Sequence, residues 1–330
     1  MQKYDKALQV LVIPYSALVS IIFGMMIISF PLGAYIVFNS DVGQEINFEY
    51  PLDDFHIFLG GISYEFPIPF ELGDVFIILW CAYLVLFAMC TIGPKKNFIK
   101  SLFSLMSHSK ADEKHNSMVT MITWFSILVI ASIAVELVQQ QGGIDIQPPQ
   151  FTNDLKQFFD VTLAPIIEEL GFRVMLIGLP LFAIFARKGS FSFFLKSIWH
   201  PSRNLHITNY KIALTLIIGV GIFFGFSHII SAEAWSIGKF AQAAVSGSII
   251  GWVYFRYGLA PAILVHWATN FFIFSYALII SDISQISVES AFSNSFMQAT
   301  EILLIITGFL SIIILVLNFM NTKKEERLQL

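Results

Sequence analysis

Charged residues and cysteines are scarce in this chain of 330 residues. Only 13% of the residues are charged, whereas 56% are hydrophobic and the mean hydropathy is +0.73. A domain dissolved in water needs more polar surface than such a composition supplies. The two cysteines, Cys81 and Cys90, are too few for a disulfide framework or a zinc site, and no feature indicates nucleic-acid binding. The composition predicts an integral membrane protein whose surroundings are the lipid bilayer.

Eight apolar stretches are long enough to cross the ~30 Å hydrocarbon core, which takes about 20 helical residues. They predict an all-α, polytopic membrane bundle of about eight transmembrane helices. The stretches cover residues 9–38, 74–93, 118–138, 159–186, 212–230, 238–255, 259–280 and 299–320. The first contains Pro31, so we expect a kink or an interfacial end there.

Lysines and arginines gather in the segments that follow every second stretch, whereas residues 39–73 carry seven acidic residues and no Lys or Arg. Since loops rich in Lys and Arg stay in the cytoplasm, both termini are predicted to be cytoplasmic. We divide the chain into an N-terminal membrane region (1–150), a core (151–285) and a last span with a cytoplasmic tail (286–330). In the acidic outer loop, residues 51–72 could form a short hairpin around Gly60 and Gly61. An ordinary loop is favoured there over a lid.

Ionisable residues interrupt the fourth apolar stretch. Glu168 and Glu169 are adjacent, and Arg173 follows Glu169 by four residues, a helical spacing that allows an ion pair. Glu168 should point about 100° away from its neighbour and could face a cavity. Charges at membrane depth cost roughly 2.5–3.5 kcal/mol each and mark functional sites by default. The alternative for these three residues is a structural ion network between helices.

Two further stretches carry histidines. His228 lies near the end of the fifth stretch, where Gly221 and Gly225 would let another helix approach closely. In the seventh stretch, His266 and Asn270 lie one helical turn apart on a shared face. Taken singly, each histidine is best interpreted as a hydrogen-bonding residue between helices.

Together, these groups suit water-dependent hydrolysis of an acyl bond better than packing alone. The sequence has neither a recognisable serine or cysteine nucleophile motif nor an H-E-x-x-H zinc signature. Two other functions stay open. One is a catalytically silent scaffold or regulator on the same fold. The other is a proton- or ion-conducting protein in which Glu168, Glu169 and Arg173 act as a relay.

Three ordered motifs give the pattern more specificity. They are Glu168-Glu169-x-x-x-Arg173, Phe224-x-x-x-His228 and His266-x-x-x-Asn270. In this order, on successive apolar helices, they resemble the CAAX-protease and bacteriocin-processing family of intramembrane proteases, which includes the Ras-converting enzymes. Residues 251–270, which lead into the last motif, are similar to the same family. The resemblance covers about residues 155–280.

The resemblance implies an endopeptidase that acts on a membrane-associated protein or peptide. Glu168 and His228 would activate a water molecule, and His266 and Asn270 would stabilise the oxyanion. Glu169, Arg173 and Phe224 would support these groups. No cofactor is required by the mechanism we favour, in which both histidines are neutral near pH 7, although Glu168, His228 and His266 have the ligand chemistry to bind zinc.

The depth of His228 raises a question, because the predicted fifth span ends only two residues later, at Ile230. Either this span extends further, or the site opens into a water-filled vestibule in the outer half of the membrane. Neither the identity of the substrate nor the oligomeric state follows from the sequence.

Overall fold

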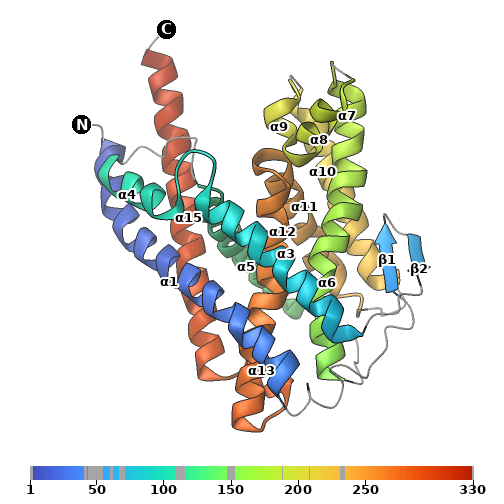
Figure 1. Cartoon of the computed structure of the whole chain (residues 1–330). Coiled ribbons are helices and arrows are strands. Elements are labelled where there is room, and N and C mark those ends of the chain that lie inside the picture. Colours follow the sequence, from blue (N-terminus) through green and yellow to red (C-terminus); the bar gives the residue numbers. More distant parts are fainter. Residues whose placement is uncertain are drawn as a thin grey trace.

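The computed structural model describes residues 3–40, 43, 55–59, 62–66, 71–108, 116–146, 153–187, 189–207, 209–230 and 235–328. Helices make up nearly all of it, which confirms the predicted all-α class (Figure 1). The helices of the N-terminal region are α1 (Lys3–Asn39), α3 (Leu72–Ile92), α4 (Phe98–His108) and α5 (Ser117–Gln141). The central helices are α6 (Asp154–Glu168), η1 (Glu169–Gly178), α7 (Leu179–Phe185), α8 (Phe191–Trp199), α9 (Pro201–Asn204), α10 (Tyr210–Ile230) and α11 (Lys239–Tyr257). The last helices are α12 (Leu259–Trp267), η2 (Ala268–Phe272), α13 (Ile273–Ser284), α14 (Val288–Phe292) and α15 (Ser295–Leu328).

Six of the described helical segments are long and apolar enough to span a membrane. They are Ala7–Asn39, Leu72–Ile92, Ser117–Gln141, Tyr210–Ile230, Leu259–Ser284 and Ser295–Asn321. The other two predicted spans, 159–186 and 238–255, are helical as well, but they contain the ionisable and small polar residues of the core. The count of about eight is therefore not confirmed, although each of the eight predicted stretches contains helix.

The first helix has no end at Pro31, while the kink expected there stays a prediction. Helix α1 continues through both Pro14 and Pro31 to Asn39. The start of α1 and the end of α15 lie toward the same end of the bundle in Figure 1. This arrangement agrees with an even number of crossings, while the side of the membrane on which the termini lie stays a prediction.

The predicted hairpin is present in the outer loop. Strands β1 (Phe55–Leu59) and β2 (Ile62–Phe66) pair in antiparallel register, with Leu59 opposite Ile62 across the two intervening residues. Strand β1 contacts α6 and η1. The hairpin therefore lies against the two helices that carry the Glu168 motif.

Aromatic side chains fill the interior behind that motif. The ring of Trp267, which is completely buried, stacks on Phe30 at a centroid distance of 5.0 Å and on Phe271 at 5.5 Å. These rings join α1 to α12 and η2. Elements of the three predicted regions pack together, α5 against α15 and α1 against α13, so the core is held inside one bundle. The division into 1–150, 151–285 and 286–330 stays a prediction.

Glycines set the spacing of α10 and α11, as the sequence predicted for Gly221 and Gly225. A Cβ atom added to Gly225 would lie 2.6 Å from the carbonyl oxygen of Phe240, and one added to Gly247 would lie 2.8 Å from the ring of Phe224. Small residues allow membrane helices to approach this closely. The close contact brings α11 up to the side of α10 that carries Phe224.

Candidate active site

A proline shapes the helix that carries the two glutamates. Pro165 lies inside α6 and has no backbone N–H, so the carbonyl of Val161 loses its usual helical partner. The side chain of Asn270 donates to this carbonyl at 3.0 Å. One residue further on, the hydroxyl of Tyr83 donates to the carbonyl of Thr162 at 2.6 Å. Side chains of two other helices thus bond the carbonyls of α6 that lie one turn before Pro165.

Both motif helices change from α-helical to π-helical geometry at the site. Segment η1 begins at Glu169 and η2 begins at Ala268, two residues after His266. The sequence analysis assumed regular α-helices, and this assumption was wrong for the residues that follow Glu168 and His266. Pro165 explains part of the change to π-helical geometry after Glu168, because it removes one α-helical hydrogen bond. π-Helical turns are rare and are frequently found at functional sites.

The predicted ion pair between Glu169 and Arg173 is present and is completely buried. Nε of Arg173 lies 3.0 Å from Oε2 of Glu169, and both side chains have 0% exposure. The guanidinium carbon of Arg173 lies 4.5 Å from the ring centroid of Phe224, and its Nη2 donates to the carbonyl of Gly247 at 3.4 Å. Arg173 therefore connects η1 to both α10 and α11.

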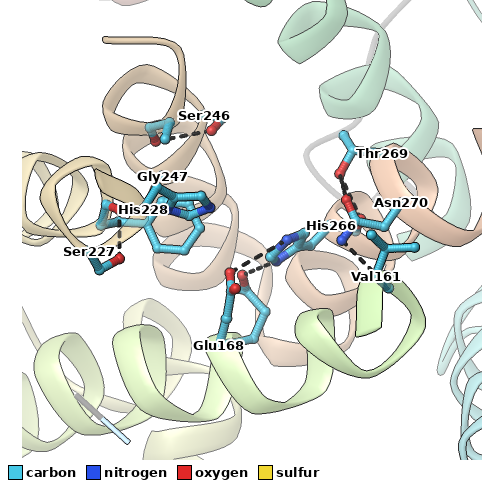
Figure 2. Close-up of polar contacts among 12 residues, drawn as sticks. Val161, Glu168, Ser227, His228, Ser246, Gly247, His266, Thr269 and Asn270 are labelled. Atoms are coloured by element: carbon cyan, nitrogen blue, oxygen red, sulfur yellow. Dashed lines mark hydrogen bonds and ion pairs between the residues drawn. The ribbon is translucent and has the colours of Figure 1, made fainter. Parts of the chain in front are cut away.

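His266 lies between the two glutamates. Its Nδ1 is 2.9 Å from Oε1 of Glu169, and its Nε2 is 3.7 Å from Oε2 of Glu168 (Figure 2). The side chain of Glu168 is 22% exposed, in contrast with the 0% of Glu169. As predicted, the two adjacent carboxylates have different surroundings. Oε2 of Glu168 is buried and has no hydrogen-bond partner among the described residues.

His228 approaches from the other side of Glu168. In Figure 2 the carboxylate of Glu168 lies between His228 and His266, and His228 is close enough to interact electrostatically with both. Nδ1 of His228 is 2.8 Å from the carbonyl oxygen of Phe224. The described part of helix α10 ends at Ile230, which puts His228 in its last described turn. Residues 231–234 lie outside the described residues, so both explanations for the depth of His228 stay predictions.

Phe224 contacts both imidazoles and the guanidinium group. Its ring centroid lies 4.6 Å from that of His228 and 6.1 Å from that of His266, in both cases edge to face. With Arg173 on the same ring, Phe224 joins side chains of η1, α10 and α12 in one place. All seven residues singled out in the sequence, from Glu168 to Asn270, belong to this cluster or bond directly to its helices.

Asn270 has a different set of contacts from the one expected. The sequence placed it beside His266, whereas the structure shows its Nδ2 bonded to Val161 and its Oδ1 accepting from Thr269 at 3.2 Å. One hydrogen of Nδ2 is used by Val161, and an amide nitrogen carries two. The role of Val161 was not foreseen, although Pro165 four residues later was a signal for it.

The residues of the cluster do not form a metal site. Among the described residues, no three His, Cys, Asp or Glu side chains are grouped so that they could hold a metal ion. Nδ1 of His266 faces Glu169 and Nδ1 of His228 faces a carbonyl. These contacts leave Nε2 of both rings without a described hydrogen bond, and whether Glu168, His228 and His266 bind zinc stays a question for experiment.

Comparison with protein families adds to this geometry. Residues 155–272 match the model described as Rce1-like, type II CAAX prenyl endopeptidase. The chain carries an Rce1-like domain. The domain spans all three motifs and confirms the resemblance to the CAAX-protease family. Neither the comparison with curated proteins nor the comparison with solved structures found a match.

The Rce1-like domain indicates an intramembrane peptidase of the CAAX type. Together with the apolar helices, it supports an integral, multi-pass membrane protein. The domain begins with the second residue of α6 and ends with η2. It therefore contains every element that contributes to the cluster around Phe224, together with the loop that joins α10 to α11.

Proposed function

We propose that the chain is an intramembrane endopeptidase that hydrolyses a peptide bond of a membrane-associated protein or peptide. The observation that carries this proposal is a cluster in which two imidazoles and a buried ion pair meet at Phe224, with the carboxylate of Glu168 next to one of the imidazoles, that of His266. Interhelical packing requires hydrogen bonds but does not require an acid next to two bases. Acid–base chemistry on a water molecule does require this combination.

Glu168 and His228 are proposed to activate the water. The carbonyl oxygen of Phe224 only accepts hydrogen bonds, so Nδ1 of His228 is the donor in their 2.8 Å contact. A neutral ring then has its lone pair on Nε2. A water bound by this nitrogen and by Oε2 of Glu168 would lose a proton to one of them as its oxygen attacks the peptide carbonyl. The same proton would pass to the leaving amine when the C–N bond breaks.

His266 and Asn270 are proposed to stabilise the oxyanion. Asn270 has a second Nδ2 hydrogen beyond the one given to Val161. His266 can donate from Nε2 only if a further proton lies between its Nδ1 and Oε1 of Glu169, on either atom. Glu169 is therefore a positioning residue that fixes both the orientation and the proton content of His266. Arg173 in turn holds Glu169.

The family match makes a lipid-modified protein one candidate substrate, since its description names prenyl endopeptidases. An unmodified membrane-associated peptide is the other. No described contact chooses between them, so the proposal covers both. The mechanism uses no metal because the site residues are not grouped to bind one.

The test compares the membrane proteomes of cells that contain the wild-type chain or Glu168→Gln. This substitution keeps the size of the side chain and removes the base, so we expect one or more cleaved termini to disappear. With purified protein, cleavage should fall about 10²–10⁴-fold. Glu301→Gln, which changes an exposed glutamate of α15, is the matched control and should leave cleavage intact. Unchanged cleavage in Glu168→Gln would exclude the mechanism.

A further inference from the structure

A lysine that the proposed mechanism does not use lies next to the site. Lys239 is the first residue of α11, and its side chain is partly buried. Its Nζ lies 4.1 Å from the ring centroid of Trp235 and donates to Oε1 of Gln242 at 2.8 Å. Among the described residues, which leave out 231–234, no carboxylate forms an ion pair with it. Its described partners are an aromatic face and a neutral amide.

The backbone fixes this lysine relative to His228. The backbone N–H of Trp235 donates to the carbonyl of His228 at 3.0 Å, so the residue whose ring contacts the ammonium group is bonded through its backbone to the end of α10. The carboxylates whose charges act on Lys239 are those of Glu168 and of Glu136 on α5, and the charge of Lys239 in turn acts on His228. A positive charge is thus held beside the proposed base and its partner.

The start of α11 is anchored from a third helix. The side-chain amide of Gln139, near the end of α5, donates to the carbonyl of Gly238 at 2.7 Å. A Cβ atom on Gly238 would lie 2.5 Å from the carbonyl oxygen of Asp145, so the chain after α5 packs directly against this glycine. The residue before Lys239 is therefore held on two sides, and the ammonium group projects from a fixed backbone.

An ammonium group beside an aromatic ring gains some stabilisation, but a partly buried one gains more from an anion that pairs with it directly. We propose that Lys239, supported by the ring of Trp235, binds a carboxylate of the substrate close to the bond that is cut. This inference rests on the proposed function and adds a substrate class, peptides with an acidic group near the scissile bond. The carboxylate can belong to the C-terminus of the substrate or to an Asp or Glu side chain.

The position of Lys239 favours a role in binding over a role in the chemical step. The proposed proton path already runs between water, Glu168 and His228, and Lys239 is not needed in it. A substrate anion at Lys239 would hold the peptide beside these two residues, and the ammonium group would neutralise its charge. The expected result of removing Lys239 is therefore a rise in KM for acidic peptides, with a smaller change in kcat.

The experiment uses the full chain in lipid nanodiscs and a library of internally quenched peptides. Each sequence is made as the free C-terminal acid, as the C-terminal amide and as the amide with one added Glu. The variants are Lys239→Met, Lys239→Arg and the control Lys156→Met, which removes a partly buried lysine about three turns of helix before Glu168. We expect the wild type to prefer carboxylate-bearing peptides by about tenfold, which corresponds to ~1.4 kcal/mol.

Lys239→Met should abolish this preference, whereas Lys239→Arg and Lys156→Met should keep it. A purely structural role would lower cleavage of acid and amide peptides alike, so an unchanged acid-to-amide ratio in Lys239→Met overturns the proposal. So does the absence of any preference in the wild type. If only the C-terminal acid is cleaved better than the plain amide, the terminal carboxylate is the ligand. If the amide with the added Glu is also cleaved better than the plain amide, a side-chain carboxylate binds as well.

A second measurement separates this inference from the proposed function. Binding of the same peptides to the wild type and to Lys239→Met is measured by their effect on thermal unfolding of the nanodisc-bound chain. If the wild type cleaves nothing, the endopeptidase proposal fails, while tighter binding of the acid forms that depends on Lys239 still supports the carboxylate site. If the wild type cleaves peptides but shows no preference for acid forms in cleavage or in binding, the carboxylate site is excluded and the endopeptidase proposal stands.

Discussion

Oε1 of Glu169 lies 2.9 Å from Nδ1 of His266, although the two residues are 97 positions apart in the sequence. The other oxygen of Glu169 contacts Arg173. One buried carboxylate therefore holds two groups, the guanidinium of its own helix and an imidazole of α12. Glu168, the preceding residue, is partly exposed, and its Oε2 has no described hydrogen-bond partner. This difference predicts opposite results when each glutamate is changed.

Glu169→Gln should destabilise the protein, and Glu168→Gln should not. Removing one member of a buried ion pair typically costs about 3–5 kcal/mol, because the partner is left charged and unpaired. We therefore expect a clearly lower Tm and weaker cleavage for Glu169→Gln. Glu168→Gln should keep the wild-type Tm and lose cleavage. Thermal unfolding of both purified variants decides the matter, and equal losses of stability would contradict the assignment of separate roles.

The bond between Asn270 and Val161 depends on Pro165. In Pro165→Ala, the new N–H at position 165 can bond the carbonyl of Val161 and compete with Asn270. One competing hydrogen bond is worth about 0.5–1.5 kcal/mol, so we expect kcat to fall roughly two- to tenfold with little change in KM. The control is Pro261→Ala, in the first turn of α12, where an added N–H has no helical carbonyl to bond. Equal kcat values in the wild type and Pro165→Ala would show that Asn270 does not depend on this proline.

The sequence predicted a set of site residues but not their contacts. Glu168, His228 and His266 were singled out because ionisable side chains at membrane depth are costly. The structure brings both imidazoles to Phe224 and the carboxylate of Glu168 to His266. The contact of Glu169 with His266 could not be derived, because spacing along one helix says nothing about a partner on another. Lys239 was overlooked. A signal existed, since it lies at the predicted outer end of a span, where the distribution of lysines predicts few positive charges.

Helix geometry limited the prediction in a second way. The i,i+4 pairing of Glu169 with Arg173 was predicted from α-helical spacing, and the pair is present even though η1 is π-helical. The π-helical segments themselves were not predicted, because hydrophobic periodicity does not resolve a local change in hydrogen bonding. The count of spans was uncertain for a related reason. The two predicted spans that are not counted, 159–186 and 238–255, contain ionisable or small polar residues, so hydropathy describes them poorly.

Close packing of α10 on α11 should be sensitive to a single methyl group. Gly225→Ala would place a Cβ atom 2.6 Å from the backbone oxygen of Phe240, and backbone atoms cannot move aside as a flexible side chain can. We expect a loss of about 1–3 kcal/mol in stability and weaker cleavage, because Phe224 and His228 shift with α10. Gly219→Ala on the same helix is the control, since its Cβ would meet nothing within 4 Å. The idea fails if both variants unfold at the wild-type temperature.

Chelation should separate the water-activation mechanism from a zinc mechanism. A catalytic zinc ion takes three protein ligands and an open position, and the described residues offer no group of three. His266 would have to bind through Nε2 while Nδ1 stays with Glu169, and Glu168 and His228 would have to move toward the same point. We therefore expect cleavage by the purified chain to survive extended dialysis against EDTA or 1,10-phenanthroline. Loss of cleavage with recovery on adding zinc, together with one bound zinc per chain by elemental analysis, would replace the proposed mechanism with metal catalysis at the same three residues.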